Sequence, residues 1–140
     1  MWGHTYPTHL KRLQSLQKIA SKIVLKQNNN YSSIDAIKRL NWIRIENRIK
    51  LHTVIYIFKA LNGLASTLAQ SLFVFSNTRF SSRLSDGRKL KLIKSNNNFY
   101  NNSIFYKGIT YYNELPLEIR SAERLSTFKR LTLKFFKTNP

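Results

Sequence analysis

The stretch LHTVIYIFKAL, residues 51–61, decides the fold of this 140-residue chain. Its side chains are apolar nearly all the way round a helix, and helices of that kind are buried in the centre of a domain. The helix is expected to begin after Trp42 and to run to about Asn62. Gly63 follows at the position where glycine commonly ends a helix. We therefore predict that this segment is the central core helix.

Upstream, residues 8–27 form the most regular amphipathic segment of the sequence. Apolar residues recur at intervals of three and four on one helical face, and lysines occupy the opposite face. This pattern predicts a helix with its apolar stripe on the core and its basic back in solvent. A basic helix lying on phosphates or on a membrane surface is the alternative interpretation. The stripe contains Leu10, Leu13, Leu16, Ile19, Ala20, Ile23 and Val24, and the basic face contains Lys11, Lys18, Lys22 and Lys26.

The other helices are predicted from serines that suit the N-cap position, where a side-chain oxygen accepts a hydrogen bond from a free backbone N–H group. Asp35, three residues after the first of these serines, completes a pattern that resembles a capping box. Residues 95–103, which are rich in asparagine, are predicted to form a loop. The predicted helices are about 33–40 after Ser32, up to about Phe73 after Ser66, 104–114 after Ser103, and a last helix capped by Ser126.

Residues 79–95 have a different pattern, in which short alternating runs flank the turn signal Asp86-Gly87. This arrangement is typical of a β-hairpin. Neither an internal repeat nor a strong linker divides the chain. The sequence therefore predicts a mainly α fold, with residues 1–140 as a single small helical domain of about five helices that also allows one short β-hairpin near residues 80–94.

The net charge indicates the class of partner. The chain has 24 Lys and Arg against 6 Asp and Glu, which gives a formal charge of +18. Such a charge attracts polyanions, and nucleic acid is the leading candidate. Lysine, asparagine and isoleucine all have codons rich in A and T, so base composition is an alternative explanation for part of the lysine excess. The arginines, whose codons are less favoured by that bias, nevertheless outnumber the acidic residues on their own.

The sequence does not contain the residue groupings that catalysis or cofactor binding requires. Cysteine is absent, which excludes disulfides, thiolate catalysis and cysteine-ligated zinc, and is consistent with an intracellular protein. The histidines lack metal-ligand spacing, and the glycines are isolated, so no phosphate-binding loop is present. The longest strongly apolar run, residues 54–58, is too short to span a bilayer. We expect no cofactor, no metal ion, no small-molecule substrate and no membrane.

Half of the acidic residues stand in or next to YYNELPLEIR, residues 111–120. Glu114, Glu118 and Glu123 are the only carboxylate cluster in the sequence, but Pro116 interrupts any helix between the first two. We interpret the segment as a helix end that Pro116 breaks. Leu115 and Ile119 are expected to anchor this break in the core, with the glutamates as surface charges offset by Arg120 and Arg124.

The remaining candidate function is a binding surface made of basic helix faces. Lysine and arginine side chains on such faces suit contacts to phosphates, and nearby aromatic rings suit base stacking. Most rings of residues 99–112 are nevertheless expected to pack in the core. The predicted nucleic-acid-binding residues, for RNA or DNA, are Lys11, Lys18, Lys22, Lys26, Arg44, Arg48, Lys129, Arg130 and Lys134.

A series of short motifs follows the chain from end to end. They are Trp2-Gly3, Leu13-x-x-Leu16-Gln17-Lys18-x-Ala20, Leu40-x-Trp42-x-x-Ile45-x-x-Arg48-Ile49, Phe58-Lys59-Ala60-Leu61-Asn62-Gly63, Tyr112-Asn113-x-Leu115-Pro116-x-x-Ile119-Arg120, and Phe128-Lys129 with the later Leu133-Lys134. In this order they resemble the region downstream of the polymerase domain in reverse transcriptases of non-LTR (LINE-type) retrotransposons, of the jockey-like and CR1-like kind. Tyr112 stands where that family has tryptophan, and the family's proline soon after Gly63 is missing.

The resemblance implies a C-terminal piece of an RNA-directed DNA polymerase. The family's polymerase aspartates, on a Tyr-x-Asp-Asp hairpin, lie upstream of this region and are absent here, so the chain is expected to be non-catalytic. In the parent protein it is expected to hold template RNA or target DNA near the polymerase. One alternative is a structural element that docks on the polymerase thumb through exposed apolar surface. Another is a remnant of a degraded element without a function of its own.

Overall fold

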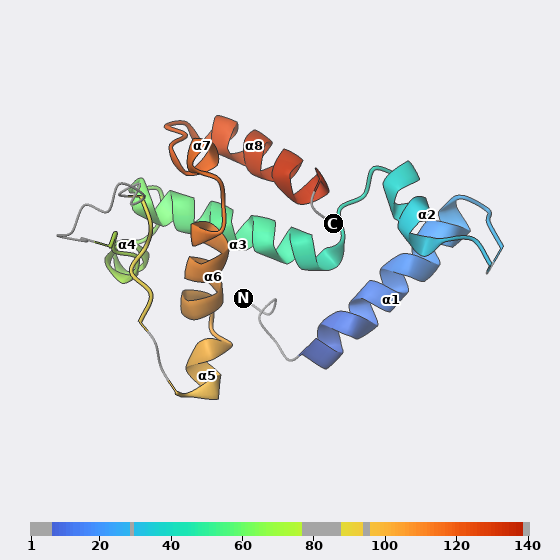
Figure 1. Ribbon diagram of the computed structural model, residues 1–140, viewed down its shortest axis with the longest axis horizontal. Helices are drawn as coiled ribbons and strands as arrows, with labels where there is room; N and C mark the ends of the chain where they lie inside the picture. Colours follow the sequence, from blue (N-terminus) through green and yellow to red (C-terminus); the bar gives the residue numbers. More distant parts are fainter. Residues whose placement is uncertain (1–6, 29, 77–87, 94–95, 139–140) are drawn as a thin grey trace.

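The computed structural model describes residues 7–28, 30–76, 88–93 and 96–138, and this part of the chain is mainly helical (Figure 1). The predicted mainly α fold is therefore confirmed, with further short helices beyond the longer ones expected. No strand is formed within the described ranges. The elements are α1 (Pro7–Val24), α2 (Ser33–Arg39), α3 (Ile45–Leu61), α4 (Thr67–Leu72), α5 (Asn98–Asn101), α6 (Ile104–Asn113), α7 (Leu117–Arg120) and α8 (Leu125–Thr138).

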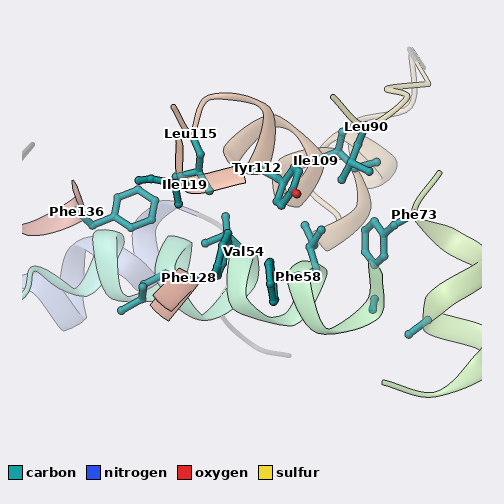
Figure 2. Packing of buried hydrophobic residues seen from close by; sticks show 14 residues of the cluster. Val54, Phe58, Phe73, Leu90, Ile109, Tyr112, Leu115, Ile119, Phe128 and Phe136 are labelled. Carbon is teal, nitrogen blue, oxygen red and sulfur yellow. The ribbon is translucent and has the colours of Figure 1, made fainter. Parts of the chain in front are cut away.

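The predicted core helix is α3, which runs through the middle of the molecule with α8 alongside it and α6 packed against it (Figure 1). Val54, Ile57 and Phe58 are buried, and the ring of Phe58 stacks on that of Phe128 from α8, with centroids 4.2 Å apart. Figure 2 shows how buried residues from several elements meet over this helix. The nearly all-round apolar character of residues 51–61 thus reflects burial by neighbours on several sides.

Three helices end in the same way, with one residue in the left-handed conformation. These residues are Lys26 (φ 51°), Asn41 (φ 54°) and Gly63 (φ 71°). In each case the next residue donates its N–H to a carbonyl five residues back, as in Leu64 to Lys59 at 2.8 Å, which is the bond of a Schellman motif. The role predicted for Gly63 is confirmed. The first helix, predicted to reach residue 27, ends sooner because Lys26 already has this conformation.

The serine caps are confirmed at three of the four predicted positions. The hydroxyl oxygens of Ser32, Ser66 and Ser103 accept hydrogen bonds from backbone N–H groups three residues ahead, at 3.3–3.4 Å. The prediction for Ser126 is wrong, because α8 already includes Leu125 and the backbone of Arg124 accepts the first helical bond. The predicted loop 95–103 also differs from the structure, which forms the single turn α5 there.

Within the described part of the predicted hairpin, Leu90 forms one antiparallel bridge, but its partner Phe75 precedes the predicted segment 80–94. The turn Asp86-Gly87 lies outside the described residues. The segment around Leu90 is held by Asn113 at the end of α6: its side-chain amide donates to the carbonyl of Leu90 at 3.0 Å and accepts from its N–H at 2.8 Å. A single side chain thereby supplies both bonds that a neighbouring strand would otherwise supply.

The segment YYNELPLEIR is a helix end, as predicted. Pro116 stands between α6 and α7, and Leu115 and Ile119 are buried in the core (Figure 2). Arg120, which was predicted to offset the charges of the glutamates, has a structural role in this turn. Its side chain is buried, and its Nε donates a hydrogen bond to the carbonyl of Leu115 at 2.8 Å. This hydrogen bond therefore stabilises the turn at Pro116.

Helix α1 packs differently from the prediction. Its buried residues are the polar Gln14 and Ser21, which lie two turns apart on one face. Most of the apolar stripe is uncovered instead: Leu16, Ile19, Ile23 and Val24 expose 62%, 56%, 69% and 57% of their surfaces. The expectation that this stripe faces the core is therefore wrong for most of its length. The helix contacts α2 and the first half of α3 and lies apart from the main core (Figure 1).

Candidate binding surfaces

The structure places the nine predicted nucleic-acid-binding residues in three groups. One group lies on α1 and its end, one at the start of α3, and one on α8. Seven of the side chains are exposed, and those of Lys22 and Arg44 are half-buried. The predicted residues therefore reach solvent, but they do not come from one continuous helix face.

The α8 group is the most compact. Phe128, Thr132 and Phe136 are buried on the inner side of this helix. Lys129, Arg130 and Lys134 are exposed on the remaining surface, together with Lys137, which the sequence interpretation did not select. The segment 125–138 contains no acidic residue. We call these four side chains the α8 basic face. The inner aromatic rings fix the helix on the core, so the cations stand on a rigid support.

The α1 group lies along one side of that helix. Lys18 and Lys22 line a hollow of about 290 Å³ together with Ile19, Ile23 and Ser33 of α2. Lys11 is exposed about two turns before Lys18, and Lys26 follows the end of the helix in the left-handed conformation. These cations are therefore positioned on the side of α1 that faces toward α2.

The two arginines near the start of α3 have different surroundings. Arg44 is the N-cap residue of α3 rather than a member of the helix. With the amide of Gln14 oriented so that both of its polar atoms are paired, its oxygen accepts from Arg44 at 2.7 Å and 3.1 Å, and its nitrogen donates to Glu46 at 2.9 Å. Arg44 thus helps to join α1 to α3. Arg48 is exposed and lines the large groove described next.

An open groove of about 770 Å³ separates α1 from the first half of α3 and the end of α8. We call it the α1–α3 groove. Its lining is largely apolar, with Arg48, His52 and Lys137 as its ionisable groups. At one end, Lys137 Nζ donates a hydrogen bond to Asn41 Oδ1 at 2.9 Å. The lining residues are Leu13, Leu16, Gln17, Ala20, Asn41, Trp42, Ile43, Ile45, Arg48, Leu51, His52, Leu133 and Lys137.

Gln17 joins α1 to the start of α3 at the wall of the groove. The Nε2 of this residue donates to the carbonyl of Ile43 at 2.8 Å, and its Oε1 accepts from the N–H of Ile45 at 3.1 Å. The amide therefore pairs with the backbone just before α3, as another peptide group would. Two motifs on which the resemblance rests meet here, since Leu13, Leu16, Gln17 and Ala20 line the groove opposite Trp42, Ile45 and Arg48.

Among the described residues, no group of three or more His, Cys, Asp or Glu side chains is arranged to hold a metal ion. No described helix combines the length and apolarity that crossing a membrane would require.

Burial raises the pKa of the Tyr111 hydroxyl above its ordinary value, and the carboxylates of Glu114 and Glu46 add to the rise. Lys50 Nζ lies 5.3 Å from the centre of the same ring.

Comparison of the chain with family models, with curated proteins and with solved structures finds no match in any of the three.

Proposed function

We propose that this chain is a non-catalytic nucleic-acid-binding segment that holds RNA or DNA through its phosphates. The observation that carries the proposal is the α8 basic face, where four cations stand on one helix without an acidic neighbour in that helix. Long basic side chains on a fixed support can contact successive phosphates and release condensed counterions. The net charge of +18 brings the polyanion to this surface.

The aromatic side chains favour phosphate contacts over base stacking. Tyr112 is buried, and Phe105 and Tyr111 pack against the core, as expected from the sequence. Rings that are occupied in this way are not free to stack on unpaired bases. Because phosphates carry no sequence information, the proposed binding is expected to have little sequence preference.

We further propose that the chain corresponds to the segment downstream of the polymerase in a non-LTR retrotransposon reverse transcriptase. The ordered series of motifs supports this origin. In such a parent, the segment would hold template RNA or target DNA near the polymerase, while the catalytic aspartates would lie upstream. Within the motif of residues 112–120, Asn113 and Arg120 form hydrogen bonds that stabilise the fold. These structural roles account for both residues, so the motif does not require a catalytic role.

The proposed function is tested by the salt dependence of binding. Fluorescence anisotropy with labelled single-stranded RNA and DNA of several sequences would be measured from about 50 to 200 mM salt. At about 0.7 per contact on single strands, six to ten phosphate contacts lose about 10²–10⁴ in affinity over this range. We expect affinity to fall steeply with salt and to vary little with sequence. Affinity that barely changed over this range would contradict the proposal.

A further inference from the structure

The uncovered face of α1 stands between two hollows. Leu16 and Ala20 line the α1–α3 groove on one side, and Ile19 and Ile23 line the smaller hollow toward α2 on the other. Leu16, Ile19 and Ile23 each leave more than half of their surface in solvent. Trp42 and Leu133 add exposed apolar surface on the far wall of the groove. Apolar surface that gathers at a groove in this way is typical of an interaction site.

We propose that the α1–α3 groove is a docking site for an acidic amphipathic helix of a partner protein. The walls of the groove are helices, and a channel between helices accepts the apolar side chains of a further helix at positions i, i+3, i+4 and i+7. Leu13, Leu16 and Ile45 would contact that apolar stripe. This inference does not rest on the nucleic-acid-binding function, because the groove lining shares only Lys137 with the α8 basic face.

The charges of the groove determine the flanks of the partner helix. Arg48 and Lys137 line the α1–α3 groove. Lys18 and Lys22 line the smaller hollow on the other side of α1. None of the described residues in either lining is an Asp or Glu. A helix seated in the groove would therefore bring its polar flanks close to cations on both sides. Acidic flanks would gain favourable interactions there, whereas basic flanks would be repelled.

The same charges disfavour the two other occupants. A second copy of the chain would bring a net charge of +18 against an equal charge. Nucleic acid would place charged phosphates against the apolar lining formed by Leu13, Leu16 and Ile45, where a buried charge has no adequate partner. In an acidic helix with a leucine stripe, the leucines would pack on the apolar lining, and the acidic flanks would lie near the surrounding lysine and arginine side chains.

The test uses a synthetic helical peptide with leucines at i, i+3, i+4 and i+7 and glutamates on both flanks. Binding to the full chain would be followed by NMR, through the indole of Trp42 and the amide of Ala20. We expect saturable shifts at both groups. The substitution L16D should weaken binding by about tenfold or more, the effect of truncating a central interface contact. Because Leu16 is 62% exposed, this variant is expected to remain folded.

The matched control is L68D, which introduces the same charge at a leucine of α4 that is 71% exposed and does not line the groove. Its affinity should equal that of the unmodified chain. The proposal is overturned if the acidic peptide does not bind, if it binds L16D and L68D equally, or if a peptide with lysines in place of the glutamates binds as well. A dimer in sedimentation that L16D dissociates, or RNA that shifts the same two signals, would also overturn it.

Discussion

Leu115 offers the most direct test of how the segment YYNELPLEIR supports the fold. Its side chain is 2% exposed and lies beside Ile119 over the core helix (Figure 2). Leu115→Ala removes three buried carbon groups, which is about 2.5 kcal/mol of transfer free energy at about 0.8 kcal/mol each. The cavity left behind raises the expected loss of unfolding free energy to about 3 kcal/mol. Urea unfolding followed by circular dichroism measures this loss as a lower midpoint.

The matched control is Leu117→Ala, the same substitution two residues later. Leu117 is 47% exposed, so less transfer free energy is at stake and no enclosed cavity forms. About half of the 2.5 kcal/mol is at stake, so the expected cost is about 1.3 kcal/mol. If Leu115→Ala cost no more than Leu117→Ala at unchanged m-value, the assignment of Leu115 as the anchor of this helix end would be refuted.

Three further substitutions test the packing of α6. Gly108→Val should destabilise by about 1–3 kcal/mol in thermal unfolding, because a Cβ at this position would already lie 3.0 Å from side-chain atoms of Thr53 and Ile57; an unchanged melting temperature would contradict the close approach. Asn113→Ala should cost about 1–3 kcal/mol, since both backbone groups of Leu90 lose their partner, and faster amide exchange at Leu90 would report it. The raised pKa of Tyr111 means that the unfolded state loses this proton first, so its contribution to stability is full below pH 10.0 and falls as pH rises through the folded pKa. Tyr111→Phe should make the decline in stability above pH 10 shallower, and an unchanged pH dependence would argue against this linkage.

The local features of the fold follow from the sequence, because they depend on neighbouring residues. Ser32, Ser66 and Ser103 cap helices within three residues of themselves, and Gly63 ends α3 through its own conformation. The contacts of α1 depend on residues far along the chain, so periodicity alone identified its stripe but not its partner. Burying Gln14 against Arg44 and Glu46 required side chains 30 residues or more away, which no local pattern indicates.

The candidate binding surfaces, like the fold, were predictable from the sequence only in part. Helix periodicity indicated which lysines and arginines share a face, and the basic residues of α8 do share an exposed surface, whereas Lys22 and Arg44 are half-buried. The burial of Arg120 could not be anticipated, because it depends on the carbonyl of Leu115 turning toward the guanidinium at the proline break. The α1–α3 groove was also missed, since it forms only where α1, the segment before α3 and the end of α8 meet.

The central claim, that the α8 basic face binds phosphates, is tested most directly by comparing two charge-matched triple variants. One replaces Lys129, Arg130 and Lys134 with glutamine, and the other replaces the exposed Lys38, Lys89 and Lys91, which lie outside α8. The slope of log affinity against log salt would be measured on single-stranded RNA for both. If the three α8 cations contact phosphates, their removal should make the slope shallower by about 2, at about 0.7 per contact, while the control variant keeps a slope close to that of the unmodified chain. Equal slopes for the two variants would contradict the claim.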